Sequence, residues 1–138
     1  MFRLDPVPKI ITFDCYGTLV QWREVLLAEL ARIFAAHGRS DAAADAVRAL
    51  DTFSRLSSAL CAAKPHRLYK TVLRDGFRAA LGEHGVDASA AEIEALAEAP
   101  KRMDPHPEVP GVLARLRERY KLAIFTNSDE DLIPHAVR

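Results

Sequence analysis

The chain has 138 residues, the size of one domain if all of its elements share a core. Its 19 basic and 19 acidic side chains balance, so no net charge recruits nucleic acid or anionic lipid. No stretch approaches the ~18 apolar residues of a membrane span, no secretory signal is seen, and two cysteines are too few for a disulfide framework or a zinc site. Composition therefore predicts a cytoplasmic protein that binds neither nucleic acid nor membrane.

The first predicted element is a strand, KIITF, at residues 9–13. A short run of β-branched and aromatic residues ended by turn formers is typical of a fully buried strand in a parallel sheet. Asp14 follows this strand directly, and Gly17 allows the chain to turn sharply just after it. The carboxylate is therefore expected where the strand leaves the sheet.

Residues 22–100 show apolar positions at helical spacing and almost no strand signal. A first helix is predicted to end at Gly38, and Ser40 or Asp41 to cap a second. The inward face of the first helix is predicted to hold Leu26, Leu30, Ile33, Phe34 and His37. That of the second is predicted to hold Ala43, Val47, Leu50, Ser54, Ser57 and Cys61.

Two further helices are predicted in the same block. The sequence KPH at residues 64–66 breaks the second helix, and a third runs from about Leu68 to His84. Ser89 and Glu92 have the spacing of a capping box for a short fourth helix, which Pro100 ends.

The proline-rich segment at residues 101–111 is predicted to be a connector. After it, an amphipathic helix at 109–119 should turn Val112, Leu113 and Leu116 inward, and KLAIFT at 121–126 should form a second buried strand. Ser128 and Asp131 have capping-box spacing for a last helix.

This order of elements predicts an α/β fold, with parallel strands joined by a helix and interrupted by an inserted helical cap. We assign residues 1–21 and 101–138 to the core and residues 22–100 to the cap. Because two parallel strands leave both faces and edges of the sheet uncovered, we expect the chain to be the first part of a larger protein. The exposed sheet is also compatible with a homodimer.

Polar residues follow both predicted strands, at the carboxyl edge where open parallel sheets bind ligands. Asp14 offers a carboxylate that, held near an electrophilic carbon or phosphorus, forms an ester that water later hydrolyses. Thr126 and Asn127 offer a hydroxyl and an amide to a substrate anion. Each residue alone is also a common turn or cap residue. Their occurrence at two strand ends favours a catalytic site.

The sequences FDCYGTLV at 13–20 and LAIFTNSDEDL at 122–132 resemble the first two motifs of the haloacid dehalogenase (HAD) superfamily, in particular its type II L-2-haloacid dehalogenase-like branch. The resemblance spans residues 9–138 and implies a Rossmann-like core with a helical cap. It also implies that Asp14 is the nucleophile, that Thr18 is the loop residue of the motif, and that Thr126 and Asn127 bind the substrate. The lysine and acidic motifs of the family lie beyond residue 138, which leaves activity of the isolated chain open.

Tyr16 separates two branches of the superfamily. The phosphatases resemble D-x-D-x-T, in which the second acid protonates the leaving alcohol, and Tyr16 takes its place here. A halide leaves without a proton, so we predict hydrolysis of a 2-haloalkanoic acid, a small organic acid, without a cofactor or metal. The alternatives are a Mg²⁺-dependent phosphatase acting on a small phosphate ester, and a non-catalytic fragment.

The dehalogenase branch places a cap arginine over the halogen and carboxylate of its substrate. Arg67 is our choice over Arg55 and Arg48, although exposed arginines are common on helices. The predicted substrate-binding residues are therefore Tyr16, Thr18, Thr126, Asn127 and Arg67. Trp22 is left open as a pocket residue or a cap anchor, Cys15 is interpreted as a buried filler, and the acids of SDED at 128–131 as helix caps that point outward.

Overall fold

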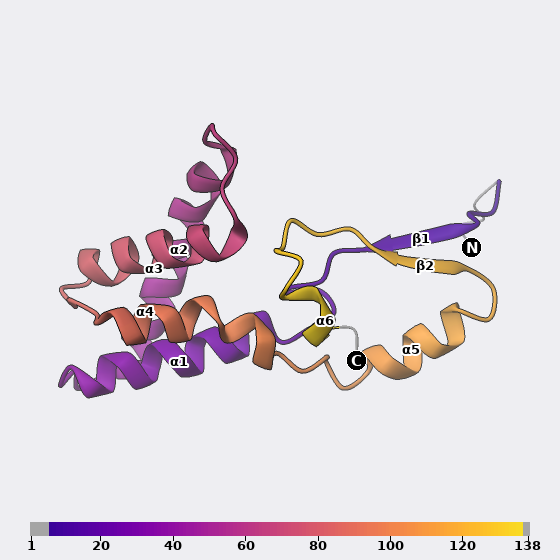
Figure 1. The fold of residues 1–138 in the computed structure, drawn as a ribbon. Helices are drawn as coiled ribbons and strands as arrows, with labels where there is room; N and C mark the ends of the chain where they lie inside the picture. Colours follow the sequence, from indigo (N-terminus) through magenta and orange to yellow (C-terminus); the bar gives the residue numbers. More distant parts are fainter. Residues whose placement is uncertain (1–5, 137–138) are drawn as a thin grey trace.

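The computed structural model describes residues 6–136. In Figure 1 the helices of the first hundred residues gather at one side, and the sheet lies beside the last two helices at the other. Within the described residues, no helix has the length and apolar character needed to cross a bilayer. In chain order the elements are β1 (Ile10–Phe13), α1 (Trp22–Ala36), α2 (Ala42–Ala62), α3 (Tyr69–Glu83), α4 (Ala90–Ala97), the 3₁₀ turn η1 (Ala99–Arg102), α5 (Val109–Leu116), β2 (Lys121–Ile124) and α6 (Ile133–Ala136).

The two strands form a parallel sheet, as predicted. Ile10 lies opposite Lys121 and Phe13 opposite Ile124, so both strands end at the same edge. The backbone N–H of Phe125 continues the pairing, donating to the Phe13 carbonyl at 2.8 Å. An incomplete parallel core with inserted helices is thus confirmed, and the residues that follow the two strands, Asp14 and Thr126 among them, leave the sheet at the same edge.

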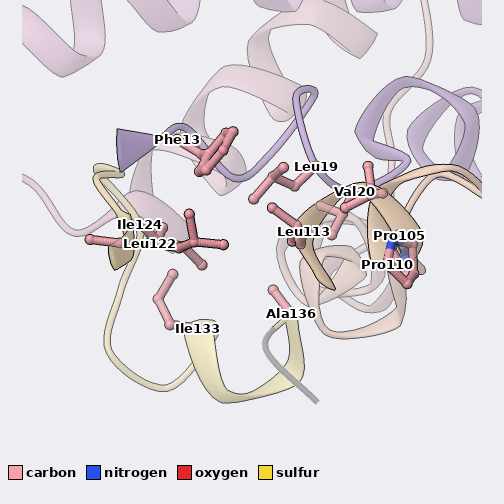
Figure 2. Close-up of a pocket in the computed structure, with 12 residues that line it drawn as sticks. Phe13, Leu19, Val20, Pro105, Pro110, Leu113, Leu122, Ile124, Ile133 and Ala136 are labelled. Carbon is pink, nitrogen blue, oxygen red and sulfur yellow. The ribbon is translucent and has the colours of Figure 1, made fainter. Parts of the chain in front are cut away.

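Full burial of the strands was predicted and is wrong. Residues in both strands alternate between exposed and half-buried, with Ile10 55% exposed. The reason is that the described residues do not cover the sheet with a closely packed layer. The helix between the strands, α5, ends at Leu116 and has no buried residue. Of its three predicted inward residues, Val112 is exposed and Leu116 is half-buried. Leu113 faces the apolar cavity of about 530 Å³ that Figure 2 shows beside Phe13 and Leu122.

The densest part of the core lies among α1, α2, α3 and α4. The prediction for α1 is confirmed for Leu26, Leu30, Ile33 and Phe34, which are buried, and for the end of the helix before Gly38, whose φ of +74° suits glycine. It is wrong for His37, which caps the helix end and is exposed. The prediction for α2 chose the wrong face, since Leu50 is the single buried residue among the six that were predicted to face inward. The buried face of α2 consists of Asp45, Ala46, Ala49, Leu50 and Phe53.

Phe53 explains why α2 turns this way. Its ring stacks on that of Phe77 with centroids 3.9 Å apart, and it passes so close to Gly76 that a Cβ there would lie 2.7 Å from it. The alanine-rich first half of α2 fits either orientation, because alanine is small and apolar. The aromatic pair and the glycine opposite it therefore set the rotation of α2.

The expected helix ends are mostly present. Asp41 caps α2 by accepting from the Ala44 N–H at 3.2 Å, and α2 ends at Ala62, just before the KPH sequence. Ser89 and Glu92 form the predicted capping box of α4. Pro100 differs from the prediction, because α4 already ends at Ala97 and the proline lies within η1.

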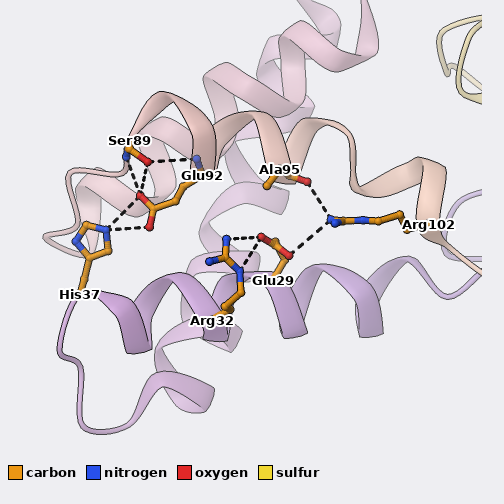
Figure 3. Close-up of polar contacts among 7 residues, drawn as sticks. All are labelled: Glu29, Arg32, His37, Ser89, Glu92, Ala95 and Arg102. Carbon is orange, nitrogen blue, oxygen red and sulfur yellow. Dashed lines mark hydrogen bonds and ion pairs between the residues drawn. The ribbon is translucent and has the colours of Figure 1, made fainter.

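The capping box also links two helices, as Figure 3 shows. The Glu92 carboxylate accepts from the Ser89 N–H and the Ser89 hydroxyl, each at 2.8 Å, and lies 3.3 Å from Nε2 of His37 at the end of α1. Nearby, Arg102 donates to the Ala95 carbonyl at 3.2 Å and lies 3.6 Å from Glu29. Hydrogen bonds from Ser89 lower the pKa of Glu92, because they favour the ionised carboxylate. The bond from the Ser89 N–H has the larger effect and the bond from its hydroxyl the next.

Replacing Glu92 with glutamine is expected to destabilise the fold in a pH-dependent way. Since the pKa of Glu92 is lower in the folded chain than in the unfolded chain, its contribution is complete above the unfolded value and is lost as pH falls through the folded value. At pH 7 the variant should lose about 0.3–1 kcal/mol of unfolding free energy, because glutamine can still complete the capping box but lacks the negative charge that suits a helix N-terminus. Urea unfolding of both proteins at a series of pH values should show this difference closing in acid, and a constant difference would contradict the assignment.

Candidate active site

A cavity of about 260 Å³ lies at the carboxyl ends of the two strands, beneath helices α1, α2 and α3. Asp14 and Tyr16 reach it from the loop after β1, and Thr126 and Asn127 from the loop after β2. The helices contribute the opposite wall. The lining consists of Asp14, Tyr16, Trp22, Phe53, Ser54, Ser57, Cys61, Tyr69, Thr126 and Asn127. Four of the six predicted site residues are therefore brought to one cavity.

The loop after β1 turns tightly and orients Asp14. The N–H groups of Thr18, Leu19 and Val20 all donate to the Cys15 carbonyl, and Gly17 has a φ of +83°, which favours glycine. This turn lets the Thr18 hydroxyl donate to the Asp14 carboxylate at 3.3 Å. Thr18 thus touches Asp14 without lining the cavity.

Cys15 lies behind the loop, 1% exposed within the core. Burial raises the pKa of its thiol, and the neighbouring Asp14 charge raises it further. A buried thiol kept protonated in this way is a poor nucleophile. Its position agrees with the interpretation of Cys15 as a filler.

Two tyrosines lie face to face in the cavity wall. The rings of Tyr16 and Tyr69 stack with centroids 6.1 Å apart, and Trp22 donates its indole N–H to the Tyr69 oxygen at 3.3 Å. Burial raises the pKa of Tyr69 to about 12, so this phenol stays protonated at neutral pH. Because its oxygen accepts from Trp22, Tyr69 keeps its own proton for a ligand. Trp22 is thus both a lining residue and the support of a donor.

Tyr16 is also held neutral. Burial raises the pKa of its phenol, although Ser128 lies close enough to oppose the shift. The hydroxyls of Tyr16 and Ser128 are both buried, and neither makes a hydrogen bond of good geometry with a described residue. Tyr16 therefore carries a buried hydroxyl that no described residue satisfies, on the side of the loop after β2, and a water would satisfy it.

Helix α2 presents acceptors to the cavity. Ser54 donates its hydroxyl proton to the Leu50 carbonyl at 2.9 Å, and Ser57 donates to the Ser54 carbonyl at 3.2 Å. Since these protons are used within the helix, the two hydroxyl oxygens are left to accept. The sequence placed Ser54, Ser57 and Cys61 on the core face of α2, whereas in the structure they line the cavity.

The cap arginines lie elsewhere. Arg67 donates to Asp75 at 2.9 Å, Arg55 to Glu83 at 2.9 Å, and Arg48 to the buried Asp45 at 2.5 Å. Each is thus paired with a carboxylate of the helical part, outside the cavity. Among the residues described, no arginine or lysine lines the cavity. The structure does not bring Arg67 together with the other predicted site residues.

The acids after β2 do not line the cavity. The expectation that they cap the helix that follows is wrong for two of them, which contact α3 instead. The Asp129 carboxylate accepts from the backbone N–H groups of Tyr69 at 2.7 Å and Lys70 at 2.9 Å, and Asp131 pairs with the Lys70 ammonium at 2.6 Å. The predicted capping box of Ser128 and Asp131 is absent, and α6 begins only at Ile133.

Sequence reasoning missed Tyr69 and Phe53 as lining residues. A weak signal existed for Tyr69, because an aromatic residue begins the helix shortly after the KPH break. Phe53 gave no such signal, since it reads equally well as a core residue of α2.

The described residues of the cavity offer few ligands for a metal ion. Asp14 supplies the single carboxylate of the described lining, and no group of three His, Cys, Asp or Glu side chains that could hold a metal ion occurs in residues 6–136. Mg²⁺ prefers several oxygen ligands in octahedral geometry, which one carboxylate does not provide.

Comparison with known proteins agrees with this arrangement. A family model described as haloacid dehalogenase-like hydrolase matches residues 8–138. Among solved structures, L-2-haloacid dehalogenase from Xanthobacter autotrophicus is similar with a TM-score of 0.77 and 22% identity, over 95% of this chain and 51% of that one. A structure of the same dehalogenase with chloropropionic acid covalently bound gives a TM-score of 0.75, 22% identity and the same coverage.

A defluorinating L-2-haloacid dehalogenase is also similar, with a TM-score of 0.74 and 25% identity over 94% of this chain and 55% of that one. The chain thus spans about half the length of these solved structures. No curated protein matches its sequence.

Proposed function

We propose that this chain, which belongs to the haloacid dehalogenase-like hydrolase family, carries the nucleophile and part of the substrate site of a hydrolase acting on 2-haloalkanoic acids. The observation that carries the proposal is the shared cavity, in which Asp14 faces Thr126 and Asn127 from the neighbouring strand end. The likeness to a dehalogenase with covalently bound chloropropionic acid supports the same reaction class.

Asp14 attacks C2 of the halo acid with a carboxylate oxygen, from the side opposite the halogen. The new C–O bond forms as the carbon–halogen bond breaks, and the halide leaves with the bonding electron pair. Water then adds to the ester carbonyl of Asp14, which releases a 2-hydroxy acid and restores the carboxylate. Because a halide needs no proton to leave, Tyr16 is compatible with this step where a second acid would otherwise be required.

The neighbouring groups suit an anionic substrate without a metal. The Thr126 hydroxyl, the Asn127 amide and the Tyr69 phenol each offer a hydrogen-bond donor to the substrate carboxylate. Thr18 holds Asp14 through its hydroxyl and so limits the rotation of the nucleophile. Phe53 and Trp22 supply an apolar surface for the alkyl and halogen part of the substrate.

The test is release of halide from 2-chloropropionate, measured with and without a chelator. We expect halide release that the chelator does not change, and an ester on the Asp14 peptide detected by mass spectrometry after a single turnover. Release of phosphate from p-nitrophenyl phosphate that the chelator abolishes, with no halide released, would instead support a magnesium-dependent phosphatase. Neither product would support a non-catalytic role.

A further inference from the structure

The first turn of α3 is capped by a residue from a distant part of the chain. Its N-cap residue, Leu68, has an apolar side chain and makes no capping hydrogen bond. Instead, the two oxygens of Asp129 accept from the N–H groups of Tyr69 and Lys70, at 2.7 and 2.9 Å. These partners are 60 and 59 residues away in sequence. A carboxylate suits this end of the helix, because the N–H groups there are unpaired and the helix dipole favours negative charge.

The same helical turn delivers a side chain to the candidate site. Tyr69, whose N–H Asp129 binds, lines the cavity, stacks on Tyr16 and accepts the indole N–H of Trp22. A shift at the start of α3 would therefore move the phenol relative to Asp14 and Trp22. Asp129 itself does not line this cavity.

We propose that Asp129 is a positioning residue, which fixes the start of α3 against the end of β2 and so places the Tyr69 hydroxyl in the cavity. The inference concerns the geometry of the cavity, and it rests on the proposed function only for its meaning in catalysis. Asp129 acts through Tyr69 and needs no contact with a substrate.

Asp131 provides a matched comparison in the same loop. It also reaches the first turn of α3, but through the Lys70 side chain, and its own side chain is 50% exposed. Lys70 has a second partner, Glu98 at 3.6 Å, which remains when Asp131 is lost. We therefore expect the partly exposed pair of Asp131 and Lys70 to contribute little to the geometry of α3.

The chain contains a single tryptophan, Trp22, whose fluorescence reports on its contact with Tyr69. We expect Asp129→Ala to shift the emission of Trp22 to longer wavelength, and Asp131→Ala to leave it unchanged. Hydrogen exchange at the Tyr69 and Lys70 amides should accelerate about 10- to 100-fold in Asp129→Ala, as expected for loss of charge-assisted hydrogen bonds. Wild-type emission and exchange in Asp129→Ala would overturn the inference.

A second variant separates positioning from capping alone. Leu68 is 62% exposed, so Leu68→Asp can supply a local cap to α3. In the double variant Leu68→Asp, Asp129→Ala we expect the thermal midpoint to recover while the shifted Trp22 emission persists, since no link to the β2 loop is restored. Recovery of both would reduce Asp129 to a helix cap and would overturn the inference. Neither readout depends on halide release, so the proposed function is tested separately.

Discussion

Replacing Asp14 with asparagine is expected to abolish halide release, with kcat lowered by more than about 10⁴-fold, as for loss of a nucleophile. The amide has nearly the size of the carboxylate but lacks its charge, and its oxygen is a far weaker nucleophile toward carbon. The Thr18 hydroxyl can still donate to the amide oxygen, so the loop after β1 should keep its conformation. Steady-state halide release and the mass of the Asp14 peptide measure the effect.

The control for this change is Asp51→Asn, which alters the charge equally on the surface of α2. The Asp51 side chain is 68% exposed and its guanidinium partner, Arg23, lies 4.0 Å away. Removing it should change halide release by less than about twofold, since exposed pairs of this kind contribute little. Asp14→Asn that keeps most of the activity, with unchanged circular dichroism, would remove Asp14 from its assigned role.

The position of Asp14 could be predicted because its cause is local. A β-branched run followed by an acid and a turn indicates a strand end, and parallel strands necessarily end at one edge of their sheet. The same reasoning brought Thr126 and Asn127 to this edge, as the register of β1 and β2 confirms. Burial of the strands was predicted wrongly, because burial depends on the layers that cover a sheet and these are not encoded in the strands themselves.

The rotation of α2 could not be predicted from its own residues. Alanines at its start are compatible with either face, and the deciding contact is between Phe53 and the space above Gly76 of another helix. One rotation buries Phe53 and turns Ser54 and Ser57 toward the cavity. Because the core face of α2 was predicted wrongly, Ser54 and Ser57 were also missed as residues of the cavity.

The contact between Asp129 and α3 was also beyond sequence reasoning. Acids after a strand are commonly read as caps of the next helix, and the spacing of Ser128 and Asp131 fitted that pattern. The structure uses Asp129 for a helix that precedes it by 60 residues. Nothing in the local spacing distinguishes the start of α3 from the start of α6, because every helix start has backbone N–H groups that need an acceptor.

Phe53→Ala is expected to cause a large loss of stability, about 3–5 kcal/mol, which is typical for removal of a buried aromatic ring. The side chain is 2% exposed, stacks on Phe77 at 3.9 Å and packs 6.2 Å from Trp22. Because native domains are stable by only about 5–15 kcal/mol, urea unfolding should show a large fall in the midpoint.

Phe34→Ala separates the loss of packing from the change at the site. Phe34 is equally buried in α1 but meets His84 edge-on at 6.4 Å and does not line the cavity. Both variants should lose similar unfolding free energy, whereas only Phe53→Ala should shift Trp22 emission and enlarge the space above Asp14. Equal emission shifts in the two variants would contradict this prediction. They would mean that the surroundings of Trp22 respond to any loss of packing in the helical core, and that Phe53 has no specific part in shaping the cavity.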